Sequence, residues 1–250
     1  MKRKDEKKII LFDFDGVIVD SFELAFKANK TIRPNLTKRD YFKCFEGNIF
    51  EEFQKLNKKR TSDSKRFFRI YIPKLFKLPV INGIPKILKL LAIKYRLIVI
   101  SSTISSPIRE WLDKHNLADY FIEIMGADVH KSKIEKIKMV FKKYKVGVND
   151  CVFITDTLGD ILEAKNAGLN SLAVTYGFHS KNILDRGNPA GFIKTPQDIP
   201  IEIEKYFKKY KNIMGNKRPK ILTDAGYEIY CDAKKQKRPA RKYVQDGSGV

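Results

Sequence analysis

Short apolar runs separated by longer amphipathic segments organise most of this sequence. Five of the runs are rich in β-branched and aromatic residues, which is typical of buried strands: residues 8–13, 97–101, 121–125, 151–156 and 171–175. Segments with the apolar spacing of helices lie between the later runs: residues 84–95, 107–115, 133–144 and 160–167. This alternation predicts an α/β fold, with a Rossmann-like, doubly wound parallel sheet of five strands covered by helices on both faces.

One connection is too long for a simple crossover. More than eighty residues separate the first run from the second, and a stretch of that length in a compact domain indicates an insertion. Its segments have helical apolar spacing without strand-like alternation: residues 21–30, 38–45, 49–58 and 63–77. We therefore expect a small helical domain over residues 19–80, inserted into a core formed by residues 1–18 and 81–210.

The distribution of charge sets the C-terminal end of the sequence apart from the rest. The 250 residues carry 50 Lys and Arg against 29 Asp and Glu, a net charge of +21 that would attract nucleic acid, anionic membranes or anionic substrates alike. Lysines occur in nearly every predicted helix, which favours solvated faces over a nucleic-acid-binding stripe. Basic clusters beyond residue 210 predict a basic, mobile tail over residues 211–250, with some strand character at 220–230.

Apolar runs and cysteines indicate the compartment. No apolar run approaches the roughly 20 residues that span a membrane, so we expect a soluble protein without a membrane partner. Cys44, Cys151 and Cys231 are far apart and lack the spacing of metal ligands. This pattern favours reduced thiols in a cytoplasmic protein over a disulfide framework or a zinc site.

Polar residues with catalytic potential gather where the predicted strands end. Ligands of an open parallel sheet bind beyond the carboxyl ends of its strands. The polar residues at these ends are Asp13 and Asp15, Ser101 and Ser102, and Asp156 with Asp160. Gly16 lets the chain turn tightly after Asp13 and Asp15, so the carboxylates of both residues can face one cavity.

Four motifs in a fixed order carry a family resemblance. The sequence DFDGVIVDS, a serine after LIVI, a lysine that opens a helix, and TDTLGDI together resemble the haloacid dehalogenase-like superfamily. The resemblance covers residues 9–206, and the helical insertion is similar to the cap of phosphoglycolate phosphatase-like members. It implies a Mg²⁺-dependent phosphatase that hydrolyses small-molecule phosphate monoesters through an aspartyl-phosphate intermediate, with a mobile cap that selects the substrate.

The resemblance assigns roles to the carboxylates. Asp13 would attack phosphorus, and Asp15 would protonate the leaving oxygen and then activate water. Mg²⁺ would be held by Asp13, Asp156 and the backbone carbonyl of Asp15, with Asp160 near the metal directly or through water. Thr155 stands where the commoner form of this motif has glycine, a change that removes no ligand.

Two further positions would bind the phosphate. The hydroxyl of Ser101, helped by backbone N–H groups of Ser102 and Thr103, would donate to a phosphoryl oxygen, with Ser102 as a competing hydroxyl. Lys133 resembles the family's lysine at a helix start. Lys131 lies two residues away and stays an alternative, because the proline that often follows this lysine is absent.

Several alternatives remain open at this stage. A dehalogenase would not need the second carboxylate, Asp15, whereas a sugar-phosphate mutase of the same fold or a non-catalytic nucleic-acid-binding protein that uses the basic tail stays possible. The expected partner is a small phosphorylated metabolite. Its anionic part would be bound by polar residues of the cap: Asn29, Arg33, Lys38 and Arg39. His179, after the fifth strand, is interpreted as structural support.

Overall fold

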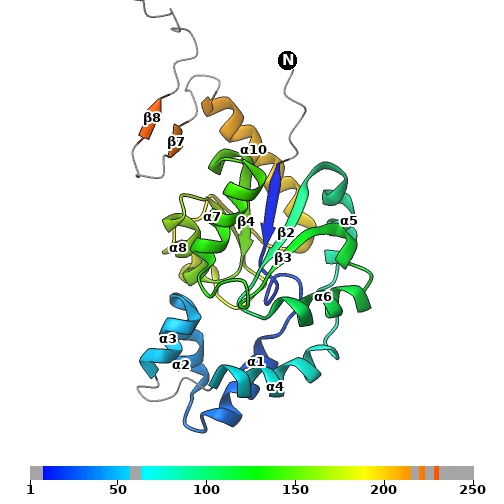
Figure 1. Cartoon of the computed structure of the whole chain (residues 1–250), viewed down its shortest axis with the longest axis vertical. Coiled ribbons are helices and arrows are strands. Elements are labelled where there is room, and N and C mark those ends of the chain that lie inside the picture. Colours follow the sequence, from blue (N-terminus) through cyan, green and yellow to red (C-terminus); the bar gives the residue numbers. More distant parts are fainter. Residues whose placement is uncertain (1–7, 57–62, 215–219, 223–227, 231–250) are drawn as a thin grey trace, which may run out of the picture. The chain divides into compact units, whose positions relative to one another are not determined.

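The computed structural model describes residues 8–56, 63–214, 220–222 and 228–230. The chain divides into two compact units, Met1–Lys209 and Tyr210–Val250. Figure 1 shows both units and labels many of their helices and strands.

A six-stranded parallel sheet forms the centre of the first unit, in the order β3-β2-β1-β4-β5-β6. The strands are β1 (Ile9–Phe12), β2 (Arg96–Ile100), β3 (Phe121–Met125), β4 (Cys151–Thr155), β5 (Ser171–Val174) and β6 (Gly191–Ile193). The parallel α/β fold is confirmed, but the prediction of five strands was wrong. The additional strand, β6, has three residues and begins with a glycine. It is too short to form an apolar run of its own and exists because it pairs with β5.

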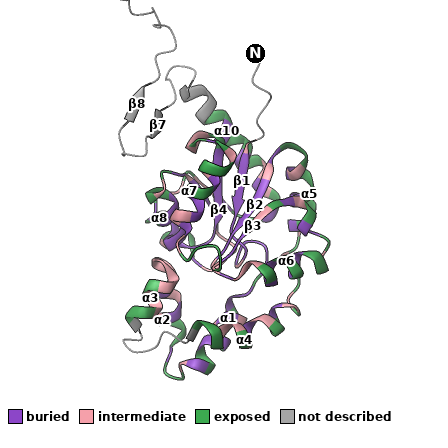
Figure 2. Ribbon diagram, viewed as in Figure 1, coloured by how far each residue is buried: buried purple, intermediate pink, exposed green. Residues whose placement is uncertain are grey.

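The central strand, β1, is covered on both faces. It pairs with β2 on one side and with β4 on the other, so that Phe12 lies opposite Val99 and Ile154. Ile9 and Leu11 pack in one apolar cluster with Ile137 and Val140, whereas alternate residues of the strand point to the opposite face. All four residues of β1 are inaccessible to solvent. The purple centre of Figure 2 shows this burial.

Four helices of the sheet-forming part begin close to their predicted positions, and two more were not predicted. The four are α5 (Ile84–Lys94), α6 (Ser105–Lys114), α7 (Lys133–Tyr144) and α8 (Leu158–Asn166). The additional helices are α9 (Lys181–Asp185) and α10 (Ile199–Met214), and 3-10 turns occur at η2 (Ala118–Tyr120), η3 (Val148–Asp150) and η4 (Pro196–Asp198). Each predicted helical segment matches one of α5 to α8 within two residues. Burial of the apolar face explains the agreement: in α6, for example, the fully buried Trp111 packs edge-on against Phe14 at 5.2 Å between ring centroids.

The connection between β1 and α5 is helical, as predicted. It contains α1 (Phe22–Ile32), α2 (Lys38–Lys43), η1 (Cys44–Glu46), α3 (Ile49–Leu56) and α4 (Asp63–Leu75). We refer to residues 19–80 as the insertion. Its incoming and outgoing chains lie side by side, because Val19 forms an antiparallel bridge with Val80 and the N–H of Ile81 donates to the carbonyl of Ile18 at 3.0 Å.

The second unit contains β7 (Lys220–Leu222) paired antiparallel with β8 (Glu228–Tyr230). Strand structure thus occurs at both ends of the stretch predicted to have strand character. Residues 211–214 continue α10 and do not begin an irregular tail. The rest of the predicted basic, mobile tail falls largely on residues 215–219, 223–227 and 231–250, which lie outside the described residues.

Within the described parts of the chain, no helix combines the length and apolar character that crossing a membrane requires.

Candidate active site

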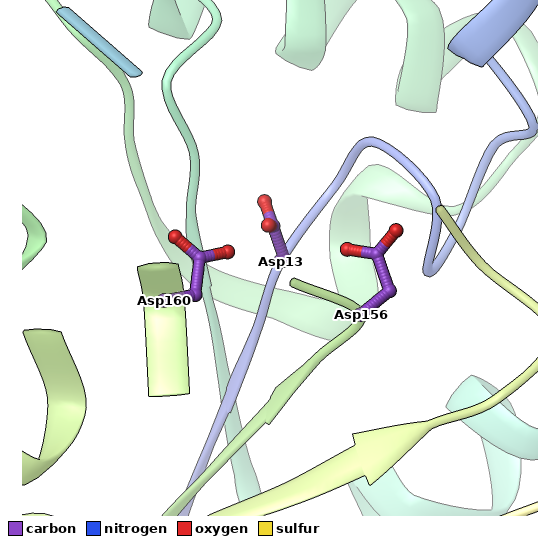
Figure 3. A group of neighbouring side chains, drawn as sticks. All are labelled: Asp13, Asp156 and Asp160. Carbon is purple, nitrogen blue, oxygen red and sulfur yellow. The ribbon is translucent and has the colours of Figure 1, made fainter. Parts of the chain in front are cut away.

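Three buried carboxylates meet at the carboxyl ends of β1 and β4. Asp13 follows β1, Asp156 follows β4, and Asp160 lies in the first turn of α8. One oxygen of each lies within 4.8 Å of the others. Figure 3 shows the three side chains directed into the same space, with Asp13 between the other two. The adjacency of β1 and β4 in the sheet therefore brings together residues that are more than 140 positions apart.

The turn after each strand holds its carboxylate in place. The N–H of Asp13 donates to the carbonyl of Ile154 at 2.9 Å, and its Oδ1 accepts from the N–H of Phe14 at 2.7 Å. At the start of α8 the hydroxyl of Thr157 caps the helix by accepting from the N–H of Asp160 at 3.3 Å. These local contacts fix the backbone from which two of the three carboxylates project.

Lys133 supplies the positive charge of this group. It is the first residue of α7, is 2% exposed, and places Nζ 2.7 Å from both Asp13 Oδ2 and Asp160 Oδ2. Thr155, at the position of the commoner glycine, donates its hydroxyl to Asp160 Oδ2 at 2.7 Å. Lys131 is exposed, and its Nζ lies 5.8 Å from the centroid of the Phe50 ring. Of the two candidate lysines, Lys133 is therefore the one that contacts Asp13.

Burial and the single lysine set the protonation of the three acids. Burial raises the pKa of Asp13 well above its usual value and that of Asp156 to about 8, against the opposing effect of Lys133 on both. Burial acts on Asp160 in the same direction, but the Lys133 charge and hydrogen bonds outweigh it and lower the pKa of Asp160 to about 2. Lys133 itself has a raised pKa, because Asp13 and Asp160 overcome the effect of its burial. One lysine thus faces more carboxylate charge than it can balance.

Asp15 lies beside this group but is held by hydroxyl groups. Its Oδ1 accepts from Ser21 at 2.6 Å and from Tyr71 at 2.5 Å, and its Oδ2 accepts from Thr103 at 2.8 Å. Hydrogen bonds donated by neighbouring hydroxyl groups therefore orient both oxygens of the Asp15 carboxylate. The side chain of Asp15 is outside the three-carboxylate group, so the ligand expected from this residue is its backbone carbonyl.

The serines after β2 occupy different places. Ser101 is fully buried, and its hydroxyl accepts from the N–H of Thr103 at 2.9 Å and lies 3.4 Å from Asp15 Oδ2. Ser102 and Thr103 line the cavity described below. The hydroxyl of Thr103, to which sequence reasoning assigned only a backbone role, is thus directed at Asp15.

Lys136 is a buried residue near the site that the sequence did not single out. Its Nζ donates to the carbonyl of Ser101 at 2.6 Å, and burial lowers the pKa of Lys136 to about 7.

A cavity of about 580 Å³ opens above these residues. Its floor includes Asp13, Asp15, Asp156, Asp160, Lys133 and Thr103, and side chains of α1, η1, α3 and α4 form its walls. Of the polar insertion residues named from the sequence, Asn29 and Arg33 line it, whereas Lys38 is exposed and paired with Glu23. The insertion therefore encloses the group of acids.

Hydrogen bonds join the insertion to the sheet-forming part near the cavity. The Nδ1 atom of His179 accepts from the N–H of Leu158 at 3.1 Å, and its Nε2 is 3.1 Å from the carbonyl of Phe42. Asn48 donates to Glu163 at 3.0 Å, and Glu163 also accepts from the N–H of Lys133 at 2.9 Å. His179 thus joins α2 to the start of α8, the supporting position expected from the sequence.

Gly16 is required by both its conformation and its neighbours. Its φ is +77°, and a Cβ atom there would overlap the Asp156 carboxylate. Gly168 has the same φ of +77°, but a Cβ atom there would meet only Val148 Cγ1 at 3.6 Å. We expect Gly168→Ala to lower the free energy of unfolding by about 1–2 kcal/mol through strain alone. Gly16→Ala should lower the free energy of unfolding by about 1–3 kcal/mol more than Gly168→Ala, because overlap with the Asp156 carboxylate is added to the backbone strain.

Urea unfolding of the two variants measures this difference directly. Equal losses would show that Asp156 moves aside freely, and therefore that its position after β4 is not rigidly determined.

Fold and site define the class of protein. Residues 10–174 match the family described as haloacid dehalogenase-like hydrolase, so the chain belongs to this family. The family resemblance inferred from the four motifs is confirmed, and the protein is a hydrolase.

Relatives with known names are phosphatases. A phosphoglycolate phosphatase of Vibrio vulnificus (strain YJ016) is 25% identical over 210 residues, which cover 74% of this chain and 91% of that protein. A 5′-nucleotidase of Pseudomonas aeruginosa is 26% identical over 206 residues, covering 73% and 89%. A solved hydrolase structure from Pseudomonas syringae superposes with a TM-score of 0.70 at 16% identity, covering 80% of this chain and 99% of that one. These names agree with a phosphoric monoester hydrolase.

Proposed function

We propose that this chain is a Mg²⁺-dependent phosphatase that hydrolyses small-molecule phosphate monoesters through an aspartyl-phosphate on Asp13. The observation that carries the proposal is the arrangement of Asp13, Asp15 and Lys133 around the floor of one cavity. A nucleophile, a second carboxylate and a buried cation are the groups that this chemistry requires.

The donor set fits a magnesium ion. The three neighbouring carboxylates offer only oxygen, the donor that Mg²⁺ prefers. Among the described residues, Asp156 Oδ1 is buried without a hydrogen-bond partner, which is unfavourable unless a cation faces it. Asp13, Asp156 and the backbone carbonyl of Asp15 would hold the ion, with Asp160 directly or through water. When bound, Mg²⁺ would neutralise charge between the phosphate and the attacking carboxylate.

Asp13 would perform the first step. One of its oxygens forms a bond to phosphorus while the bond from phosphorus to the leaving alcohol oxygen breaks. Asp15 donates a proton to that oxygen, which leaves as the neutral alcohol. The hydroxyls of Tyr71 and Thr103 hold opposite oxygens of Asp15, so its orientation is determined before substrate binds.

Asp15 would also act in the second step. As a carboxylate it removes a proton from water, and the water oxygen attacks phosphorus while the bond to Asp13 breaks. Inorganic phosphate is released and both carboxylates return to their starting state. Lys133, 2.7 Å from Asp13, balances negative charge near the transferring group in both steps.

The insertion would act as a cap and bind the alcohol part of the substrate. It contributes most of the walls of the cavity, and its Tyr71 reaches Asp15. Closure over the floor would exclude bulk water from the phosphorylated enzyme. Small phosphorylated metabolites are the expected substrates, because the cavity is bounded by this insertion.

Phosphate release tests the proposal. Acetyl phosphate and a panel of phosphate monoesters are incubated with the full chain, in Mg²⁺ or in excess chelator. We expect turnover in Mg²⁺ and at least about a hundredfold less in chelator, since the buried acids then repel the phosphate. Equal rates under both conditions, or no turnover of any ester by folded protein, would contradict it.

Magnesium should stabilise the fold more strongly at higher pH. The pKa of Asp156 is about 8 in the folded chain and 3.8 when exposed. Between these values the folded state retains a proton that the unfolded state has lost, so metal-free stability falls as pH rises. Ion binding must displace the same proton and therefore strengthens over this interval. The increase in Tm caused by Mg²⁺ should grow from about pH 6 to about pH 8.5.

Thermal melts with and without Mg²⁺ at the two pH values give the measurement, and Asp156→Asn serves as the control that should lose the increase. An increase that is the same at both pH values in the unsubstituted chain would show that Asp156 is not protonated in the metal-free site.

A further inference from the structure

We propose that the substrate's alcohol part carries a flat aromatic ring, as in a nucleoside monophosphate, and that this ring binds between phenyl rings on the insertion. The inference rests on the proposed function for the position of the phosphate. It concerns the other end of the same cavity, where the chemical character of the lining changes.

The cavity has a charged end and an aromatic end. Carboxylates and Lys133 form the floor, whereas five phenylalanines line the walls contributed by η1, α3 and α4: Phe45, Phe50, Phe53, Phe67 and Phe68. Each of these side chains is only half-buried. Phenyl rings that line a cavity without being fully covered provide apolar, flat surface for a ligand, and such surface is what small-molecule sites typically offer.

The aromatic wall begins next to the reacting groups. The hydroxyl of Tyr71 donates to Asp15 Oδ1 at 2.5 Å, and its ring stacks on Phe67 with centroids 5.0 Å apart and an interplanar angle of 17°. Phe67 is one helical turn from Tyr71 on α4, so the two rings form a continuous face. A substrate with its phosphate beside Asp15 therefore meets aromatic surface immediately beyond its ester oxygen.

Another phenyl ring of the cavity wall, that of Phe53, already contacts a flat group. The guanidinium of Arg33 lies 4.5 Å from the centroid of the Phe53 ring, and its Nη1 donates to Asn29 Oδ1 at 2.8 Å. Planar groups stack on phenyl faces through their π-systems. Gln54 and Ser64 also line the cavity, are exposed, and offer neutral hydrogen-bonding groups. The polar edge of a base and the hydroxyls of a pentose match such neighbours.

Size disfavours a two-carbon acid. A cavity of about 580 Å³ lies within the roughly 300–1,000 Å³ typical of drug-sized ligands, and a two-carbon acid would leave most of it empty. A nucleoside monophosphate has the matching order of parts: phosphate, neutral sugar, flat ring.

A matched pair of substrates isolates the contribution of the ring. Ribose 5-phosphate has the same reacting ester and sugar as a nucleoside 5′-monophosphate but lacks the base. We expect the better of adenosine and uridine 5′-monophosphate to exceed ribose 5-phosphate and 2-phosphoglycolate at least about fivefold in kcat/KM, because stacking of one base is worth roughly fivefold or more. This comparison uses the full chain in Mg²⁺.

Two variants test where the ring binds. Phe53→Ala and Phe67→Ala should each lower the ratio of kcat/KM between nucleotide and ribose 5-phosphate about fivefold or more. The ratio does not depend on how much of the enzyme is folded. Phe76→Ala is the matched control: Phe76 is half-buried just beyond α4, does not line the cavity, and should leave the ratio unchanged.

A wild-type ratio of one or below, or a ratio that neither alanine variant lowers, would overturn the inference. Failure of the proposed function is recognised separately, by absence of turnover with every phosphate ester and also with acetyl phosphate. Binding to Asp13→Asn protein then decides the question of the ring. Nucleotide affinity at least about fivefold above that of ribose 5-phosphate in Mg²⁺ would support an aromatic ligand, and equal affinities would overturn it.

Discussion

Asp13→Asn is expected to lower kcat for phosphate monoesters by about 10⁴-fold or more, the scale observed when a covalent nucleophile is removed. The amide is nearly the same size as the carboxylate but lacks the charged oxygen that would attack phosphorus. Its oxygen can still accept the 2.7 Å hydrogen bond from the N–H of Phe14. The loss should therefore occur in protein that remains folded, as judged by circular dichroism and a cooperative melt.

A control for this substitution is available eight residues from the end of β1. Asp20 is exposed and follows the same loop. Asp20→Asn should change kcat less than about twofold, since surface substitutions rarely matter. If Asp13→Asn retained a tenth or more of the activity, Asp13 would not be the nucleophile, and the proposed aspartyl-phosphate would be wrong.

Lys133→Met is expected to have the largest effect on stability. The ammonium lies 2.7 Å from Asp13 and from Asp160, and the side chains of all three residues are nearly inaccessible. Removal of one partner of a buried ion pair leaves uncompensated charge and typically costs about 3–5 kcal/mol. We expect a loss of this size in the free energy of unfolding in chelator at about pH 8, together with a decrease in kcat of about 10³-fold.

The loss should become smaller as pH falls. Without Lys133, burial and mutual repulsion would place the folded pKa of both Asp13 and Asp160 above the unfolded value, so the folded state would retain protons that the unfolded state releases. Stability of the variant should therefore rise from about pH 8 to about pH 5, which urea unfolding at both pH values would detect.

Lys131→Met is the matched control because Lys131 is exposed and only two residues away. Lys131→Met should lower the free energy of unfolding by less than about 0.5 kcal/mol. A larger loss from Lys131→Met than from Lys133→Met would mean that the two lysines have been assigned in the wrong order.

The meeting of Asp13 with Asp156 and Asp160 was largely predictable. Both parallel strands end in acids, and neighbouring parallel strands end at the same edge of the sheet. Asp13 and Asp160 are each held in part by contacts within a few residues, namely the hydrogen bonds from the N–H of Phe14 and between Thr157 and Asp160. Asp156 accepts instead from the N–H of Phe178 in a later loop, so local sequence carries only part of the information for this site.

The hydroxyl groups around Asp15 were not predictable in the same way. Tyr71 is 56 positions away on α4, and its contact depends on how the insertion packs. Within a helix, Tyr71 and Phe67 have the apolar spacing of ordinary core residues, so nothing in the pattern distinguishes a cavity wall from a core. The roles of Ser101, Ser102 and Thr103 depend on the turn after β2. There the Ser101 hydroxyl accepts from the N–H of Thr103, Ser102 lines the cavity, and the Thr103 hydroxyl, which was not among the candidates, points to Asp15.

The bridge between Val19 and Val80 has a consequence for how such an enzyme diversifies. Because the chain leaves the sheet and returns to it at neighbouring points, the two ends of the intervening helical segment lie side by side. Any helical segment whose ends lie equally close could be spliced there without shifting the register of β1 against β2 and β4. Recombination at this junction could therefore exchange ligand recognition between lineages while the reacting groups of the sheet are inherited intact.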